Sequence, residues 1–181
     1  MMAPQAGSGI DAPLLGPPSG SERQVVAYIR RHLPANSEYQ NDVETIMGYY
    51  WRYGLPVGLD PFLAAVQCIH ETAALTSAWA ARPHRNPAGI GVTGEPGKGV
   101  SFPSWAEAVR AHLGRLLAYA LAPGVGTPAQ QALITEALHW RSLPANRRGA
   151  APTLRKLAGT WAADPRYADK IARLANAIRA L

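Results

Sequence analysis

The side chain with the clearest chemical meaning in this chain is the carboxyl of Glu71, near the end of the apolar run PFLAAVQCIHET. A helix that is apolar on every side belongs in a protein core. Burial disfavours an ionised carboxylate and raises its pKa, which can keep a Glu protonated near neutral pH. Glu71 is therefore a candidate general acid. The simpler alternative is a partly solvated residue at the flank of a buried helix, or one paired with an arginine.

Two further reactive side chains, Cys68 and His70, lie on the same run. A nucleophilic Cys/His pair needs an exposed, deprotonated thiol, so an apolar helix favours a plain core role for Cys68. As the single cysteine, it also excludes an intrachain disulfide. A zinc peptidase helix carries its second His four residues after the first, and that position is Ala74. We expect no metal and no cofactor.

Length and composition predict one folded unit that faces an anionic partner. The chain has 181 residues, of which 48% are hydrophobic, enough for one domain and too few for two large ones. Residues 1–81 carry four Arg against seven acids, net −3, whereas residues 82–181 carry fourteen Lys or Arg against five acids, net +9. Such a basic half suits an acidic wall polymer, nucleic acid or anionic lipid, although a solvated charged face is the default. Its arginines include Arg82, Arg85, Arg110, Arg147 and Arg148.

The first 20 residues, MMAPQAGSGIDAPLLGPPSG, are rich in Pro, Gly, Ser and Ala. This composition predicts a flexible arm at 1–20 ahead of a single domain at 21–181. The same segment lacks the positive start and continuous apolar stretch of a signal peptide. No run of about 18 consecutive apolar residues occurs, so we expect no membrane span.

Capping residues and apolar spacing predict a mostly α-helical body. Ser21, followed three residues later by Gln24, predicts a helix start. Asp60 before Pro61 predicts the start of the buried helix that carries Glu71. Further helices are expected over residues 37–53, 104–121, 128–141 and 164–181.

The stretch from Arg82 to Pro103 interrupts this helical pattern. Glycines and prolines alternate there with short β-prone pieces such as GIGV and GVSF. The pattern predicts a small hairpin or irregular β lobe directly after the helix of Glu71. The expected fold class is therefore mostly α with one β-hairpin excursion.

The chain contains three blocks, in this order: HETAALTSAWAARPHRNPAGIGV, FPSWAEAVRAHLGRLLAYA and WAADPRYADKIARLANAI. Together they resemble the glucosaminidase domain family, glycoside hydrolase family 73, which is similar to mannosyl-glycoprotein endo-β-N-acetylglucosaminidases. The resemblance covers about residues 40–181. The family pattern has a helix ending in the catalytic Glu, an Asn followed by a Gly-Ile turn, and the late motif Tyr-Ala-Thr-Asp-Pro-x-Tyr-Ala-x-Lys. These features fall at Glu71, at Asn86 to Ile90 and at Trp161 to Lys170.

The resemblance implies a lysozyme-like fold, with a helical body and a small β lobe around a sugar-binding cleft. It implies an endo-β-N-acetylglucosaminidase that hydrolyses the β-1,4 bond after N-acetylglucosamine in bacterial peptidoglycan, with Glu71 as the general acid. The implied partner is the glycan strand of the cell wall. Such an enzyme, an endolysin or autolysin, acts outside the cytoplasm or is delivered by a phage.

Two departures from the family pattern bear on the mechanism. Trp161 stands where the family usually has a tyrosine, and Glu95 is the only acid of the short β lobe. Glu95 is a candidate base for an inverting attack, or else a solvated turn residue. In the second case the 2-acetamido group of the substrate itself can stabilise the reacting centre.

Sugar rings present apolar faces edged by hydroxyls, so aromatic and amide side chains are the candidates for substrate binding. The candidates are Trp79, Asn86, Trp161 and Tyr167. Each has a structural alternative. The tryptophans, like Trp105, can belong to the core, Asn86 can fix its own turn, and Tyr167 can pack the last helix.

Two other classes of function fit the same sequence. A lysozyme-like lytic transglycosylase or muramidase also uses a single Glu, but cleaves on the muramic-acid side of the strand. A non-catalytic helical module for the cell wall or for nucleic acid would account for the basic second half, including ANRRGAAPTLRK at 145–156. A nucleic-acid binder would lose affinity steeply with salt and tolerate Glu71→Gln, and we expect no nucleic-acid partner.

Overall fold

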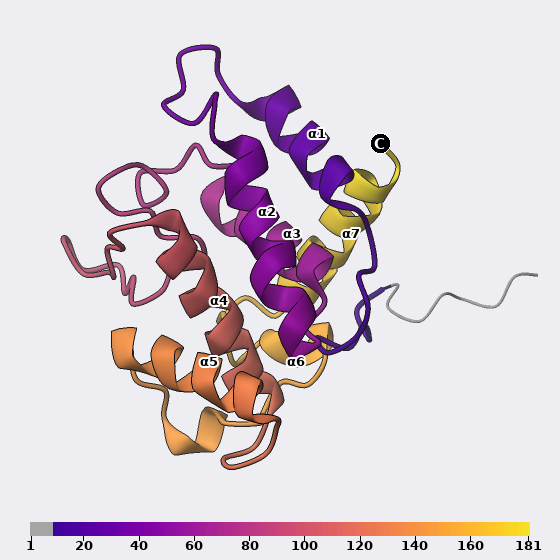
Figure 1. Ribbon diagram of the computed structural model, residues 1–181, viewed down its shortest axis with the longest axis vertical. Coiled ribbons are helices and arrows are strands. Elements are labelled where there is room, and N and C mark those ends of the chain that lie inside the picture. The colour runs from indigo at the N-terminus through magenta and orange to yellow at the C-terminus, as the bar shows by residue number, and fades with distance from the viewer. Residues whose placement is uncertain (1–8) are drawn as a thin grey trace, which may run out of the picture.

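The computed structural model describes residues 9–181, which form an almost entirely helical structure (Figure 1). This confirms the mostly α class. In this part of the chain, no helix has both the length and the apolarity needed to cross a bilayer. In chain order the elements are α1 (Glu22–His32), α2 (Val43–Gly54), the 3-10 helix η1 (Leu55–Val57), α3 (Pro61–Thr72), α4 (Trp105–Ala120), α5 (Pro128–Trp140), the 3-10 helix η2 (Ala145–Arg147), α6 (Leu154–Leu157) and α7 (Tyr167–Arg179).

Hydrogen bonds confirm the helix starts predicted at Ser21 and Asp60 and show further caps at Ser104 and Thr127. Ser21 forms a capping box at the start of α1, and Thr127 forms one at the start of α5. The Asp60 carboxylate accepts two backbone N–H bonds at the start of α3, and Ser104 caps α4. Each cap satisfies amides that the first helical turn leaves free.

The helix predicted over residues 37–53 begins only at Val43, as α2. The Ser37 hydroxyl accepts the backbone N–H of Tyr39 at 3.1 Å, a local bond that competes with helix formation. Tyr39 is buried, and its phenol donates to the backbone carbonyl of Ala80. This distant contact holds the segment before α2 in a non-helical path.

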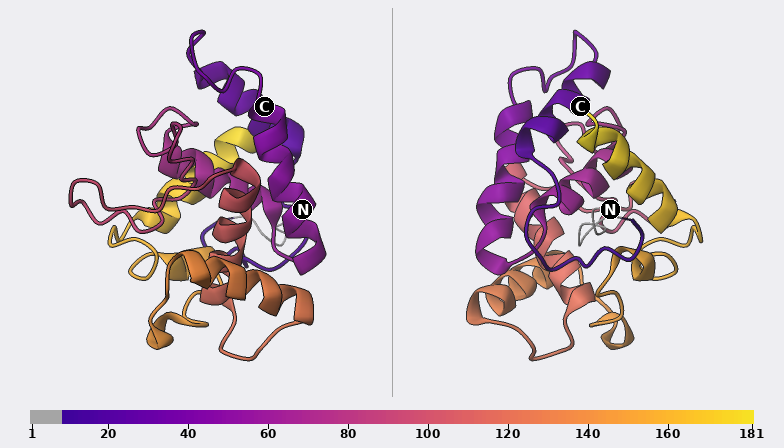
Figure 2. Two further views of the ribbon diagram at one scale, coloured as in Figure 1. Left: turned by 60° about the vertical axis from the view of Figure 1, so that its left-hand side comes forward. Right: turned by 90° about the vertical axis from the view of Figure 1, so that its right-hand side faces the viewer.

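The predicted β-hairpin lobe is wrong. Residues 73–104 form turns and loops that project beside α3 and α4 (Figure 2), and residues 9–181 contain isolated bridges but no strand. Four glycines from Gly89 to Gly97 have a positive φ, which is incompatible with regular extended backbone. Backbone bonds from the Val100 N–H to the Ile90 carbonyl and from the Phe102 N–H to the His84 carbonyl join the two sides of the loop.

Helix α3 occupies the centre of the molecule. It packs against α1, α2, α4 and α7, and ten of its twelve residues are buried. Helix α5 packs on α4 at the end of the molecule opposite α1 (Figure 1). The apolar character of PFLAAVQCIHET on all sides therefore has its explanation in the helices that surround it, and only the last turn of α3 approaches the surface.

Residues 9–20 are packed on the body, which differs from the predicted flexible arm; residues 1–8 lie outside the described residues. Leu14 is 3% exposed. Its N–H donates to the carbonyl of Pro152, and its carbonyl accepts the N–H of Asp60. This segment therefore joins the start of α3 to the region before α6. The Pro and Gly content of this segment correctly predicted a backbone without helix or strand, but it did not predict that Leu14 is buried.

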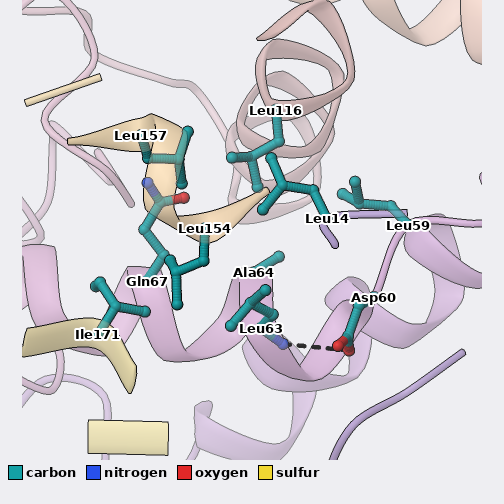
Figure 3. Close-up of a pocket in the computed structure, with 10 residues that line it drawn as sticks. All are labelled: Leu14, Leu59, Asp60, Leu63, Ala64, Gln67, Leu116, Leu154, Leu157 and Ile171. Carbon is teal, nitrogen blue, oxygen red and sulfur yellow. Dashed lines mark hydrogen bonds between the residues drawn. The ribbon is translucent and has the colours of Figure 1, made fainter. Parts of the chain in front are cut away.

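A small internal space lies beside α3, between this N-terminal segment and α6 (Figure 3). Its volume is about 10 Å³, which has room for about one water molecule. A substrate must therefore bind elsewhere. The residues around the space are Leu14, Leu59, Asp60, Leu63, Ala64, Gln67, Leu116, Leu154, Leu157 and Ile171.

Candidate functional site

Glu71 lies in the last turn of α3 with its side chain partly buried. Its Oε1 accepts a hydrogen bond of 2.6 Å from the phenol of Tyr167, the first residue of α7. Tyr167 is only 3% exposed. The packing of α7 on α3 thus brings the late sequence motif into direct contact with the candidate acid.

Burial raises the pKa of the Glu71 carboxyl above its ordinary value. The hydrogen bond from Tyr167 and the nearby His70 both act in the opposite direction, but burial is the larger effect. Glu71 therefore keeps its proton to a higher pH than an exposed Glu, as a general acid working near neutral pH requires.

The backbone reverses sharply directly after α3. Residues 73–75, Ala-Ala-Leu, have φ values of 48°, 56° and 66°, a left-handed conformation that costs roughly 1–2 kcal/mol for each residue with a Cβ. Thr72 supports the turn, because its hydroxyl donates to the carbonyl of Cys68 and accepts the N–H of Leu75. Strain that the surroundings enforce in this way is typical of functional sites. The turn at residues 73–75 leads the chain away from α3 just after Glu71.

A row of polar side chains continues from Tyr167 into the core. The Tyr167 phenol accepts a bond of 2.9 Å from Gln67 Nε2, and Gln67 Oε1 lies 2.6 Å from His112 Nε2. His112 Nδ1 lies 2.8 Å from the phenol of Tyr50. Each of these four side chains is at most 3% exposed.

One assignment of protons satisfies every contact in this row. Tyr167 donates its single proton to Glu71, so it must accept from the amide nitrogen of Gln67. Gln67 Oε1 then accepts from His112 Nε2, which leaves His112 Nδ1 to accept from Tyr50. Burial lowers the pKa of His112 to about 3, so its ring is neutral, as this assignment requires. The row fixes the direction in which Tyr167 points.

Asn86 holds the turn that follows the Glu71 helix. Its Nδ2 donates to the carbonyls of Ile90 and Val100, and its Oδ1 accepts the N–H groups of Ala88 and Ile90. All four hydrogen-bonding positions of the amide are thus used, and the residue is 1% exposed. This geometry agrees with the structural alternative for Asn86, in which its amide fixes the turn.

A cleft of about 160 Å³ opens beside this turn. It is lined by residues 88–92 and by the side chains of Arg115, Tyr119, Arg141 and Trp161.

Gly89 connects the cleft to the acid. Its φ is 66°, and a Cβ built on it would lie 3.4 Å from Oε2 of Glu71. Oε2 of Glu71 therefore lies next to Gly89, a residue that lines the cleft. A Cβ at this position would touch the carboxyl at an ordinary van der Waals distance, but the positive φ would strain the backbone of any residue other than glycine.

Trp161 lies in the same cleft and is partly exposed. Its ring centroid is 5.2 Å from that of Tyr119 and 5.8 Å from that of His112. The Tyr119 and His112 rings thus pack near the indole, and Tyr119 also lines the cleft. Of the predicted substrate-binding residues, Trp161 is the one that the structure places in the cleft, while Tyr167 lies behind Glu71.

The structure places the other candidates apart from this cleft. Trp79 is partly buried, with its ring 4.3 Å from that of His84 and packed closely over Gly99. Trp105 is 6% exposed and meets the Tyr39 ring edge to face, so it belongs to the core.

Glu95 lies in an exposed turn. Its backbone carbonyl accepts the N–H of Lys98, and within residues 9–181 its carboxylate has no hydrogen bond or ion pair. This geometry agrees with the solvated-turn alternative rather than with a preorganised catalytic base.

The Cys/His alternative is inconsistent with the surroundings of Cys68. Burial raises the pKa of its thiol to about 12, so no thiolate is present at neutral pH. In the described part of the chain, no group of three or more His, Cys, Asp or Glu side chains is arranged to hold a metal ion.

Several residues of this site were not identified from the sequence: Tyr50, Gln67, His112, Arg115, Tyr119 and Arg141. Gln67 and His112 are polar residues within otherwise apolar helical stretches. Buried polar groups must find partners, so the two could have been paired on that basis. Arg115 carries no comparable signal, because an arginine on a helix is usually solvated.

The matches to known proteins do not establish a family for this chain. No family model matches it. A similar curated protein from Borreliella burgdorferi, described as an uncharacterized protein, is 29% identical over 158 residues, which are 86% of this chain and 73% of that protein. The crystal structure of S. aureus autolysin E in complex with the muropeptide NAM-L-Ala-D-iGlu superposes with a TM-score of 0.48 and 14% identity, over 96% of this chain and 73% of that chain. Similarity at this level establishes neither a shared fold nor a shared activity.

Proposed function

We propose that this chain is a peptidoglycan hydrolase that cleaves the β-1,4 bond after N-acetylglucosamine, with Glu71 as the general acid. The observation that carries the proposal is a partly buried carboxyl of raised pKa, held by Tyr167 beside a cleft that contains a partly exposed tryptophan. The resemblance of the sequence around Glu71, Asn86 and Trp161 to glucosaminidase domains supports the same reaction and a lysozyme-like arrangement.

The two oxygens of Glu71 take different roles in this reaction. Oε1 accepts the bond from Tyr167, so the acid proton resides on Oε2, the oxygen nearer Gly89. From there the proton passes to the glycosidic oxygen as its bond to the anomeric carbon breaks. The leaving sugar departs as an alcohol, and Glu71 is left as a carboxylate.

The 2-acetamido group of the substrate takes the second role. The candidate second carboxylate, Glu95, lies in an exposed turn and has no side-chain partner within residues 9–181, whereas a protein nucleophile or base must be held in place beside the sugar. In this proposal the acetamido oxygen attacks the anomeric carbon as the leaving oxygen takes the proton. Water then opens the cyclic intermediate and gives its proton to the Glu71 carboxylate, which restores the acid.

Trp161 supplies the platform for a sugar ring. Sugar faces are apolar, and a partly exposed indole packed near Tyr119 and His112 offers a rigid surface for them. Stacking of this kind replaces the phenol that the family usually has at this position. The net charge of +9 in the second half of the chain favours residence on an anionic wall.

The test is digestion of purified peptidoglycan by the wild-type protein, by Glu71→Gln and by Glu95→Gln. Fragments are reduced with borohydride and their ends are identified by mass spectrometry. We expect reduced N-acetylglucosamine ends from the wild type and from Glu95→Gln, and none from Glu71→Gln.

Each other result of the digestion points to a different function or mechanism. Anhydromuramic ends would assign a lytic transglycosylase, and reduced muramic ends a muramidase. Loss of activity in Glu95→Gln would assign an inverting mechanism with Glu95 as its base. No release from walls of several types would leave a non-catalytic binding module.

A further inference from the structure

Two arginines in the cleft beside Glu71 lack an acidic partner. Arg115 of α4 and Arg141, the residue after α5, both line the cleft. Arg115 Nη1 donates to the backbone carbonyl of Arg141 at 2.9 Å, which joins the two helices at this point. Within residues 9–181 neither side chain forms an ion pair with Asp or Glu.

Two arginines that the sequence assigned to a basic surface are neutralised within the fold. Arg82 pairs with Glu38 and Asp42, and Arg110 pairs with Glu136. Arg85, Arg147 and Arg148 of that surface form no ion pair within residues 9–181 either. Arg115 and Arg141 differ from them because both line one cleft.

The position of Arg115 favours an anion in its vicinity. Burial lowers the pKa of its guanidinium, the charge of Arg141 lowers it too, and Tyr119 acts in the opposite direction. An arginine nevertheless stays protonated at neutral pH. Arg115 is partly buried and the exposed Arg141 adds a second positive charge at the cleft, so an anion between the two guanidinium groups would stabilise both. The cleft is therefore complementary to a negatively charged group.

The size and neighbours of the cleft restrict what that group is. Its volume of about 160 Å³ is smaller than the roughly 300–1,000 Å³ of a site that encloses a whole small-molecule ligand. It fits a substituent of a sugar rather than a strand. Trp161 lies in the same cleft, and Gly89 of its wall adjoins Glu71. The anion must therefore be carried by a sugar close to the bond that Glu71 would protonate.

We propose that Arg115 and Arg141 form a subsite for a carboxylate carried by the glycan strand, on a sugar next to the cleaved bond. A planar guanidinium binds a carboxylate through paired N–H···O bonds, so this chemistry suits arginine better than lysine. The subsite rests on the proposed function for the identity of the strand. Two carboxylates are available on that strand: the lactyl group of muramic acid where no peptide is attached, and the acidic groups of the stem peptide.

The test is calorimetric binding to the Glu71→Gln protein, which requires no turnover. Three tetrasaccharides are compared: an N-acetylglucosamine oligomer without charge, an alternating N-acetylglucosamine and N-acetylmuramic acid oligomer with free lactyl groups, and the same oligomer bearing L-Ala-D-iGlu. We expect at least one charged ligand to bind about tenfold more tightly than the neutral one, as a charge-assisted hydrogen bond predicts. That advantage shrinks as salt is raised. The tighter of the two charged ligands identifies the source of the carboxylate.

Arg141→Gln in the same background removes one charge and keeps the backbone carbonyl that Arg115 uses. The Arg141 side chain is exposed, so the fold is not at risk. We expect the affinity for the preferred charged ligand to fall about tenfold and the affinity for the neutral ligand to stay unchanged. Arg115→Lys, which keeps the charge and loses the planar fork, should reduce the same preference by a smaller factor. Arg31→Gln on the exposed surface of α1 is the matched control for charge alone.

Equal affinity for charged and neutral ligands overturns the subsite, as does an Arg141→Gln loss that is the same for all three. Absence of measurable binding to every ligand overturns it too. Cleavage by the wild-type protein tests the proposed function separately. A protein that prefers the charged ligand but cleaves nothing keeps the subsite and loses the hydrolase, whereas one that cleaves without that preference keeps the hydrolase and loses the subsite.

Discussion

Removal of the Tyr167 phenol tests how Glu71 is held. Tyr167→Phe deletes one oxygen, which donates to Glu71 Oε1 at 2.6 Å and accepts from Gln67 Nε2 at 2.9 Å. The bond from Tyr167 lowers the pKa of Glu71 against the larger, opposite effect of burial. Its loss must therefore raise that pKa further. The basic limb of the kcat/KM profile, which reports the acid of the free enzyme, should move to higher pH.

The same substitution should also destabilise the protein, because it leaves the buried Gln67 amide without its acceptor. An unsatisfied buried donor costs about 1–3 kcal/mol. For a chain of 181 residues that cost lowers the Tm by roughly 2–12 °C.

Carbon-13 NMR of protein labelled at its glutamates measures the pKa of Glu71 directly, with the Glu71→Gln spectrum assigning its resonance. Thermal unfolding followed by circular dichroism measures the Tm. Tyr49→Phe is the matched control, because Tyr49 stacks on Tyr53 and its phenol makes no hydrogen bond in the part of the chain that the structure describes. A Glu71 pKa that is unchanged or lower in Tyr167→Phe would show that the bond from Tyr167 does not stabilise the Glu71 carboxylate.

Three further predictions concern stability, measured by urea denaturation. Ala73→Gly relieves a φ of 48° and should raise the free energy of unfolding by up to about 1 kcal/mol. The control Ala132→Gly, on the exposed surface of α5, should lower the free energy of unfolding by about 1 kcal/mol. Equal losses of stability in the two variants would mean that residue 73 is not strained. Leu14→Ala should cost about 2–5 kcal/mol because Leu14 is 3% exposed, and an unchanged midpoint would show that the N-terminal segment is not part of the fold. The pKa of His112 in the folded protein, about 3, lies below its ordinary value of 6.5. Between these two pH values the unfolded chain binds one proton more than the folded chain does. The free energy of unfolding therefore falls by up to about 1.4 kcal/mol per unit as the pH is lowered below 6.5. His112→Gln should remove this slope, and a variant that keeps it would assign the slope to other groups.

The helices that could be predicted from the sequence are those with local signals. Asp60 before Pro61 marks the start of α3 because both act within the first helical turn. The start of α2 was placed too early, because the path of the preceding segment depends on a bond between Tyr39 and Ala80. Local patterns carry no information about such a contact.

In the segment after α3, too, local sequence predicted the irregular backbone but not the path that it takes. Its glycines and prolines identified it as irregular, but β-prone tetrapeptides such as GIGV suggested strands. In the structure, Gly89 and Gly91 adopt a positive φ, and Asn86 binds the backbone of Ile90 and Val100. Composition therefore predicts where the loop lies, whereas its path depends on side-chain bonds between distant residues.

The candidate site was predicted only in part for the same reason. Glu71 is detectable because a carboxyl at the end of an apolar run is unusual on local grounds alone. The row from Gln67 to His112 depends on how α3 packs near α4, and the pair of Arg115 and Arg141 depends on how α4 packs against α5. Neither relation is encoded in the spacing of residues along one helix.

The most direct measurement of the central claim is the rate of reducing-end release from peptidoglycan by Glu71→Gln, compared with the wild type at the same pH. Glutamine keeps the shape of the side chain and cannot donate the proton that the leaving oxygen needs. We predict a loss of about 10²–10⁴-fold, the contribution of a general acid, in a variant whose circular dichroism is that of the wild type. A folded Glu71→Gln that releases reducing ends within about tenfold of the wild-type rate would contradict this prediction, because that loss is smaller than a general acid contributes.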